Sequence, residues 1–178
     1  AARYAMLTWV YDKFQRIPYL RILGDFGTGK SRFLDVMASI TYNASKLGVG
    51  LTAANIYRWL EQFPGTLIFD EVDFSSSTTK DLVTQVLNGG FDRNTPVIRS
   101  DKGVIGYETK PYNTFGPKIL ASRESFYDDA LESRFITLYS IEKTRRDIPI
   151  NLPTPIKWDD ALNIRNKLLS FRLENHSL

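Results

Sequence analysis

The sequence has no cysteine, only one histidine, and no hydrophobic run of the length that crosses a membrane. Without cysteine, disulfides, thiolate catalysis and zinc sites with cysteine ligands are excluded. The single histidine, His176, stands near the C-terminal end, so a histidine-based metal centre or catalytic triad is excluded as well. Because we find neither a membrane span nor a signal peptide, we expect an intracellular protein.

The composition is that of a globular domain. Of the 178 residues, 43% are hydrophobic and 24% are charged, which provides enough apolar material for a buried core. The formal net charge of +3 permits nucleic-acid binding but does not indicate it. The chain begins with two alanines and reads like an excised piece of a longer polypeptide.

Strand patterns alternate with helix patterns along the chain, which predicts an α/β domain with a mostly parallel sheet. Residues 96–110 have the pattern of a β-hairpin with its turn at 101–103. We expect a core domain at residues 1–150, followed at 151–178 by a proline-marked linker and an amphipathic helix at 158–174. The expected strands are 19–23, 40–45, 66–71, 117–122 and 134–140, and the main helices are 31–40, 52–63 and 79–88.

Eight residues after the first expected strand fit the pattern G-x-x-x-x-G-K-[ST], the Walker A motif or P-loop. A phosphate chain needs several backbone N–H groups that converge on it, which requires positive φ and no Cβ in the way. The helix that follows adds its positive end. A glycine-rich turn can match this pattern by accident, but its position between a strand and a helix favours a nucleotide site. The eight residues are Gly24, Asp25, Phe26, Gly27, Thr28, Gly29, Lys30 and Ser31.

This motif and the later stretch "LIFDEVD" together predict a site for ATP and Mg²⁺. We expect Lys30 to pair with the β- and γ-phosphates and Ser31 to ligate Mg²⁺. Asp70 follows a buried strand and is expected to hold Mg²⁺ through water, while Glu71 polarises the attacking water. Two acidic residues can also end a strand without any catalytic role. A hydrolase needs the second carboxylate, however, so the pair indicates an ATPase.

Two positions further along the chain are candidates for the same reaction. Ser122 ends the fourth expected strand, where its hydroxyl could reach the γ-phosphate or the attacking water. Arg134 begins the fifth strand and could neutralise transition-state charge in a neighbouring subunit, as arginine fingers do. The alternatives are a serine that merely ends a strand, and a surface arginine paired with Glu132 or Asp129.

The motifs "GDFGTGKS", "LIFDEVD", "KILAS" and "SRF" occur in the order found in AAA+ ATPases, which the chain resembles over residues 19 to about 140. The resemblance implies a three-layer sandwich around a five-stranded sheet in the order 5-1-4-3-2. It implies that the site lies at the carboxyl ends of the strands, and that Ser122 is the sensor-1 residue. The helix at 158–174 would be the start of a lid domain.

Within that family, "GDFGTGKS" and "SRF" resemble the minichromosome-maintenance (MCM) helicases. "FGPKILAS" and "LESRFI" resemble the helicase domains of viral and plasmid primase-helicases, which implies DNA replication in a prokaryote or in the host cell of a virus or plasmid. In both groups a hairpin before the sensor-1 strand projects into the pore of a hexameric ring and contacts DNA. By position, Lys102 would be the tip contact with Arg99 and Lys110 beside it, although a lysine at an exposed turn is commonly just solvated.

Three functions share these ATPase parts. The first is a DNA helicase or translocase that acts as a ring oligomer. The second is a loader or switch that assembles on DNA without unwinding it. The third is a protein-remodelling ATPase, which commonly carries an aromatic residue in the loop after the second strand; the corresponding stretch "KLGVGLT" has none.

Overall fold

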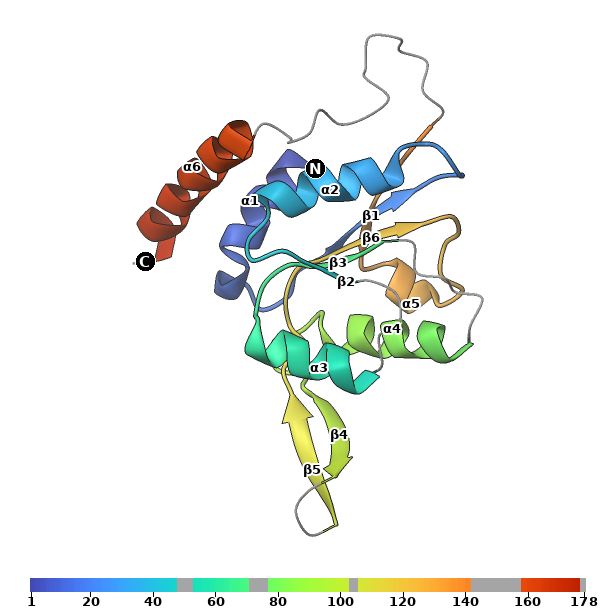
Figure 1. Ribbon diagram of the computed structural model, residues 1–178. Helices are drawn as coiled ribbons and strands as arrows, with labels where there is room; N and C mark the ends of the chain where they lie inside the picture. The colour runs from blue at the N-terminus through green and yellow to red at the C-terminus, as the bar shows by residue number, and fades with distance from the viewer. Residues whose placement is uncertain (48–52, 71–76, 103–105, 142–157, 177–178) are drawn as a thin grey trace.

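The computed structural model describes residues 1–47, 53–70, 77–102, 106–141 and 158–176 (Figure 1). Helices and strands alternate along most of the chain, as the sequence pattern predicts. The helices are α1 (Ala2–Trp9), the 3-10 turn η1 (Tyr11–Lys13), α2 (Lys30–Ile40), α3 (Ala53–Gln62), α4 (Ser77–Gly89), α5 (Asp129–Glu132) and α6 (Trp158–His176). The strands are β1 (Tyr19–Leu23), β2 (Ser45–Leu47), β3 (Leu67–Phe69), β4 (Val97–Lys102), β5 (Tyr107–Tyr112), β6 (Lys118–Ser122) and β7 (Phe135–Tyr139).

Five strands form one parallel sheet in the order β2-β3-β6-β1-β7, and β4 and β5 pair only with each other. If the five strands of this sheet are renumbered by their order in the chain, β6 becomes the fourth strand and β7 the fifth. The sheet order is then 2-3-4-1-5, which reads 5-1-4-3-2 from the opposite edge. Because all four pairings are parallel, the carboxyl ends of β1, β3, β6 and β7 lie at the same edge of the sheet. Any group that follows one of these strands therefore lies near groups that follow the others.

The sheet is covered by helices on both faces, with α1 and α2 on one side and α3 and α4 on the other (Figure 1). The alternation of side chains along β1 shows how the two cores form. Leu20 and Ile22 pack with residues of α1 and α2, whereas Tyr19 packs with residues of α3 and α4. Since successive strand residues point to opposite faces, a nearly continuous apolar strand is the pattern that this three-layer arrangement requires.

The strand expected at 40–45 is misplaced, because α2 continues to Ile40 and β2 begins only at Ser45. The hydroxyl of Thr41 donates a hydrogen bond of 2.8 Å to the carbonyl of Met37 and so closes the last helical turn. Asn43 then has a φ of 41°, in the left-handed region that asparagine tolerates better than most residues. The apolar run at 40–45 is thus divided between a helix end and a turn.

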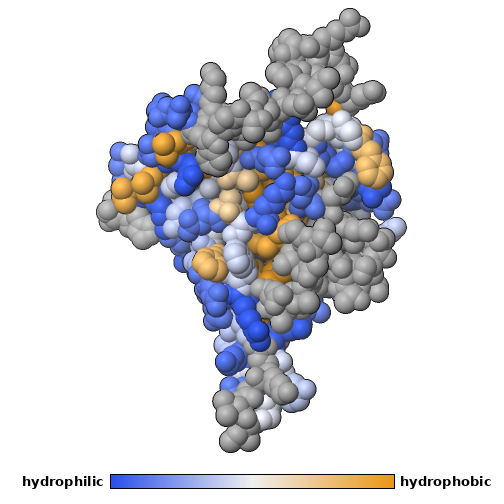
Figure 2. All heavy atoms as spheres, in the orientation of Figure 1, coloured by the Kyte–Doolittle hydropathy of each residue, from blue (hydrophilic) through white to orange (hydrophobic). Residues whose placement is uncertain are grey.

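β4 and β5 form an antiparallel ribbon that projects from the body of the molecule (Figure 1). Their pairing runs from Val97 opposite Tyr112 to Lys102 opposite Tyr107. The turn expected at 101–103 is therefore wrong, since 101 and 102 belong to β4; residues 103–105 lie outside the described part. Figure 2 shows that the face of the ribbon turned to the viewer is mostly hydrophilic.

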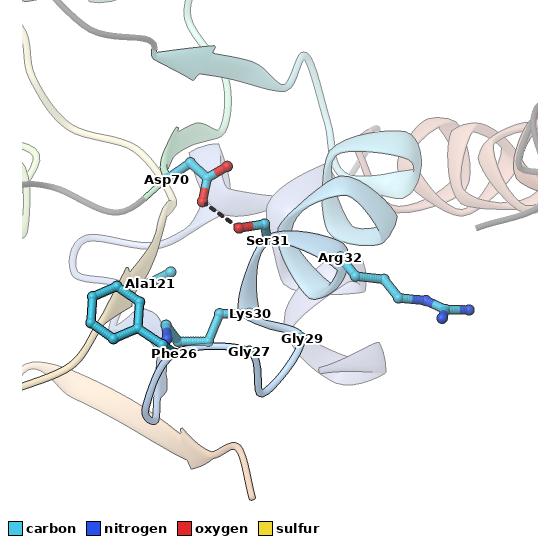
Figure 3. A pocket seen from close by; sticks show the side chains of 8 residues that line it. All are labelled: Phe26, Gly27, Gly29, Lys30, Ser31, Arg32, Asp70 and Ala121. Atoms are coloured by element: carbon cyan, nitrogen blue, oxygen red, sulfur yellow. Dashed lines mark hydrogen bonds between the residues drawn. The ribbon is translucent and has the colours of Figure 1, made fainter. Parts of the chain in front are cut away.

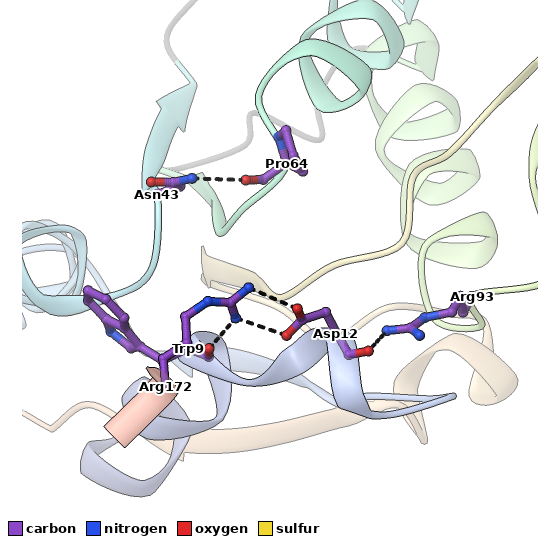
Figure 4. A network of polar contacts seen from close by, with 6 residues as sticks. All are labelled: Trp9, Asp12, Asn43, Pro64, Arg93 and Arg172. Carbon is purple, nitrogen blue, oxygen red and sulfur yellow. Dashed lines mark hydrogen bonds and ion pairs between the residues drawn. The ribbon is translucent and has the colours of Figure 1, made fainter. Parts of the chain in front are cut away.

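The C-terminal helix α6 is anchored to the N-terminal segment by a polar network (Figure 4). Arg172 donates two hydrogen bonds to the Asp12 carboxylate, of 2.9 and 2.8 Å, and a third to the carbonyl of Trp9. The Asp12 carboxylate raises the pKa of Arg172. Arg93 holds the backbone carbonyl of Asp12 from the other side, so this one residue joins three segments.

The helix expected to be amphipathic at 158–174 does not have a single apolar face. Ala161 and Leu168 are buried, but other apolar side chains of α6 are exposed to solvent. These are Leu162, Ile164, Leu169 and Leu173.

Within the described residues, no helix is both long enough and apolar enough to cross a membrane.

A buried lysine lies at the start of the central strand β6. Lys118 is 1% exposed, and its ammonium donates hydrogen bonds to the carbonyls of Thr114 (2.7 Å) and Gly116 (3.1 Å) and lies 5.0 Å from the centroid of the Tyr19 ring. Gly90 makes room for it, since a Cβ there would lie 2.2 Å from the lysine nitrogen. Burial lowers the pKa of Lys118 to about 7.

This lysine should make stability depend on pH. From about pH 7 to about pH 9.5 the folded chain holds Lys118 largely neutral while the unfolded chain holds it protonated, so the free energy of unfolding rises with pH by at most about 1.4 kcal/mol per pH unit. Lys118→Met should remove this dependence, whereas Lys13→Met, a change at an exposed position, should retain it. Urea unfolding at several pH values measures both slopes. An unchanged slope in Lys118→Met would show that Lys118 is charged in the folded chain.

Candidate functional site

The predicted P-loop joins the end of β1 to the start of α2, and two of its glycines have backbone conformations that other residues rarely adopt. Gly27 has a φ of 74° and Gly29 a φ of 87°. A Cβ on either would meet no atom within 4 Å. Backbone conformation, not lack of space, is therefore the reason for glycine at both positions.

The loop is also fixed from outside by Ser140, which follows β7. Its backbone N–H donates to the carbonyl of Leu23 (2.7 Å), and its hydroxyl donates to the carbonyl of Thr28 (2.7 Å). Gly24 packs so closely here that a Cβ would lie 2.5 Å from the Ser140 carbonyl oxygen. Sequence reasoning missed Ser140, because only the pairing of β1 with β7 brings it to the loop.

A cavity of about 270 Å³ opens between this loop and the end of β3 (Figure 3). Lys30, at the first turn of α2, is 7% exposed, and its ammonium donates to the carbonyls of Gly24 (2.8 Å) and Asp25 (2.6 Å). No side chain caps the N-terminus of α2, so its positive end is available to an anion. The cavity is lined by Phe26, Gly27, Gly29, Lys30, Ser31, Arg32, Asp70 and Ala121.

The two predicted metal-binding residues meet in this cavity. The hydroxyl of Ser31 donates a hydrogen bond of 3.2 Å to Oδ1 of Asp70, which follows β3 (Figure 3). The other carboxylate oxygen, Oδ2, pairs with the ammonium of Lys46 at 2.7 Å, and Lys46 also pairs with Asp35 at 2.8 Å. Partial burial opposes the charge of Lys46, but hydrogen bonds to Asp35 and Asp70 leave its pKa raised.

These oxygens fit a magnesium ion. Mg²⁺ takes hard oxygen ligands and usually binds through one or two protein oxygens together with waters and substrate phosphates. The adjacent hydroxyl and carboxylate oxygens of Ser31 and Asp70 provide such a pair. In the described part of the chain no group of three or more His, Cys, Asp or Glu residues could hold a metal by itself. Lys46 was missed in the sequence because its stretch was expected to be the loop after the second strand.

Two other residues were predicted to act on the terminal phosphate or on the attacking water, and the structure describes only one of them. Glu71 lies outside the described residues. Ser122 ends β6 as expected, but it is 2% exposed and is not among the residues that line the cavity. Its hydroxyl is buried without a hydrogen-bond partner, whereas its backbone carbonyl accepts a hydrogen bond from Gly24.

Arg134 lies at the amino end of β7, on the edge of the sheet opposite the cavity. It does not pair with Glu132 or Asp129, the alternative considered from the sequence: its guanidinium donates to Oδ1 (2.8 Å) and the carbonyl (3.2 Å) of Asn88. Glu132 instead accepts two hydrogen bonds from Arg21, a 1% exposed residue of β1, and these lower the pKa of Glu132. The buried Arg21–Glu132 pair thus fixes the segment that carries Arg134.

The three residues predicted to contact DNA differ in their surroundings. Arg99 of β4 faces the body of the molecule, where it donates to the side chain of Gln85 (3.2 Å) and lies 5.2 Å from the centroid of the Tyr57 ring. Lys110, opposite Arg99 in β5, is exposed. Lys102 is the last residue of β4 rather than part of the turn, and its side chain lies outside the described part.

Comparison with known proteins yields structural matches only, since neither a family model nor a curated protein matches the chain. A crystal structure of JCV helicase with a bound small molecule matches with a TM-score of 0.50 and 13% identity over 94% of this chain and 55% of that chain. An X-ray structure of JCV helicase matches with a TM-score of 0.49 and 14% identity, over 80% and 40%. The apo C-terminal region of NrS-1 matches with a TM-score of 0.43 and 17% identity, over 96% and 38%.

The first of these matches shows that the chain shares its fold with the matching part of that structure. At 13% identity it shows the fold alone, and the chain spans only 40% to 55% of the length of the JCV helicase chains. The resemblance to MCM helicases stays a prediction.

The role of the loop conformation can be tested with two glycines that lie in different parts of the chain but have nearly the same φ. Gly29→Ala and Gly106→Ala both place a side chain at a φ of 87° or 83° in open space, so each should lower the free energy of unfolding by about 1 kcal/mol. Only Gly29 lines the cavity, so only Gly29→Ala should also weaken binding of an ATP analogue with Mg²⁺. Urea unfolding and calorimetric titration measure the two effects. Equal binding by both variants would contradict a role of this loop in holding phosphate.

Proposed function

We propose that this chain is an ATP-hydrolysing motor domain of the AAA+ type, which works as a DNA helicase or translocase in a ring of identical subunits, hexameric by the family resemblance. The observation that carries the proposal is the meeting of Lys30, Ser31 and Asp70 in one cavity at the carboxyl edge of a parallel sheet. Nucleotides bind at this edge in open α/β sheets in general.

Each cavity residue has a defined task in the proposal. Lys30 exchanges its hydrogen bonds to loop carbonyls for bonds to the β- and γ-phosphates, and the first turn of α2 supplies backbone N–H groups. Ser31 and Asp70 would hold Mg²⁺, which when bound would supply positive charge next to the phosphates. Glu71, one residue after Asp70, orients and deprotonates the attacking water. Ser122, whose hydroxyl is buried outside the cavity lining, would have to turn toward the cavity to assist in placing this water.

Arg134 is proposed as the residue that one subunit supplies to the cavity of the next. A five-residue strand is about 16 Å long, and Arg134 precedes β7 whereas the cavity lies beyond its other end. The residue therefore lies too far from the cavity of its own chain, which favours action across an interface. The anchor that Arg21 and Glu132 provide would hold it at a constant position.

The projecting ribbon is proposed as the DNA contact, with Lys102 and Lys110 binding phosphates. Backbone contacts of this kind are electrostatic and independent of sequence. Arg99, unlike Lys110, faces the body of the molecule. Its contacts with Gln85 and Tyr57 tie the ribbon to α4 and α3. In the proposal these contacts transmit movement between the ATPase core and the ribbon, and Arg99 contributes only long-range positive charge to DNA.

The proposal predicts an ATPase that responds to single-stranded DNA. Wild-type turnover should rise when single-stranded DNA is added, and forked DNA should be unwound. Lys30→Ala should lower turnover by about 10² or more through loss of phosphate binding, whereas Lys13→Ala, a lysine that does not line the cavity, should retain it. Glu71→Gln should bind an ATP analogue normally but stop turnover. Phosphate release and strand displacement measure these outcomes.

The same experiment separates the rival functions. Stimulation of the ATPase by DNA without strand displacement would favour a loader or switch. ATPase activity with no response to DNA would favour protein remodelling. No ATPase activity, together with no binding of the analogue, would contradict the proposal altogether.

A further inference from the structure

The P-loop carries an aromatic residue that the phosphate chemistry described above does not use. Phe26 is 69% exposed although it stands between two glycines of a tight loop. A single exposed aromatic ring is ordinary on a protein surface, so what matters is where this ring lies and what it contacts. The ring lines the cavity, on the same side as Lys30 (Figure 3).

The exposed ring holds an arginine from a distant part of the chain. The guanidinium carbon of Arg123 lies 4.0 Å from the centroid of the Phe26 ring. A cation over the face of an aromatic ring is attracted by the ring quadrupole, and a planar guanidinium can also stack on it. The P-loop and the residue that follows β6 are thereby joined at the rim of the cavity.

Arg123 lies just beyond the end of β6 and reaches the rim of the cavity through Phe26, whereas the Ser122 hydroxyl is buried. Ala121 lines the cavity, and its neighbour Ser122 has a buried hydroxyl outside the lining. Arg123 follows the last residue of β6, at a bend of the chain. Arg123, two residues after Ala121, is exposed and reaches the ring that forms the cavity wall.

We propose that Arg123 is a further nucleotide-binding residue, which contacts the terminal phosphate of a nucleoside triphosphate from the rim of the cavity, with Phe26 as the platform that positions its guanidinium. This rests on the proposed nucleotide site and adds to it a residue that discriminates triphosphate from diphosphate. Arginine matches phosphate oxygens with a planar pair of N–H donors, which makes it suited to this task. Lys30 approaches the phosphates from the loop side, so the two cations would contact them from different elements.

Arg32 provides a matched control. It lines the cavity and carries the same charge as Arg123, but it belongs to α2 and its side chain points away from Lys30 and Asp70 (Figure 3). Removal of either arginine changes the net charge equally. Only a residue that contacts the terminal phosphate should change the ratio of triphosphate to diphosphate affinity.

The test is calorimetric titration of the chain with a non-hydrolysable ATP analogue and with ADP, both in Mg²⁺. Arg123→Ala should weaken binding of the analogue by about ten-fold or more, the effect of a lost charged hydrogen bond, and should leave ADP affinity nearly unchanged. Arg123→Lys should recover part of the loss, and Phe26→Leu should produce a smaller loss in the same direction. Arg32→Ala should leave the ratio of the two affinities as in the wild type.

Two results would overturn the inference while the proposed function stands. One is an unchanged analogue affinity in Arg123→Ala, and the other is an equal loss for the analogue and ADP. If the wild-type chain bound neither nucleotide, the proposed function itself would be contradicted. Thermal unfolding of each variant, which should match the wild type because Arg123 is exposed, shows that a loss of binding does not reflect loss of the fold.

Discussion

The candidate site depends on one structural constraint, the parallel alignment of β1, β6 and β3. This alignment places the ends of β1 and β3 at one edge of the sheet, although Leu23 and Asp70 are far apart along the chain. The hydrogen bond between Ser31 and Asp70, at 3.2 Å, is the direct link between the two motifs. If either strand were antiparallel or shifted by one residue, the phosphate loop and the carboxylate would not line one cavity.

Several charged contacts hold elements in the positions that this site requires. Lys46 joins Asp70 to Asp35 and so connects β2, β3 and α2 beside the cavity. Arg21 binds Glu132 within the sheet core and fixes α5 against β1. Arg21 is buried, and removal of one partner of a buried charge pair generally costs more than the pair contributes. The pairs of Lys46 are partly exposed to solvent, so they orient side chains more than they add stability. Lys118, buried with backbone carbonyls as hydrogen-bond acceptors, carries a desolvation cost that these hydrogen bonds only partly offset.

Local patterns predicted much of the fold and the centre of the site, and they failed where distant contacts decide. The P-loop and Asp70 were recognisable because the glycines and the buried strand are local signals. The start of β2 was misplaced because apolar residues at a helix end resemble those of a strand. Ser140 and the stack of Arg123 on Phe26 carry no local signal, since both depend on which strands are neighbours in the sheet.

The central claim is that the cavity beside Lys30 binds the triphosphate of a nucleotide together with magnesium. The most direct measurement is a crystal structure of this chain with a non-hydrolysable ATP analogue and Mg²⁺. The account predicts the terminal phosphates within hydrogen-bond distance of the Lys30 ammonium, and the metal beside Ser31 and Asp70. A nucleotide bound elsewhere, or a metal away from these two oxygens, would contradict it.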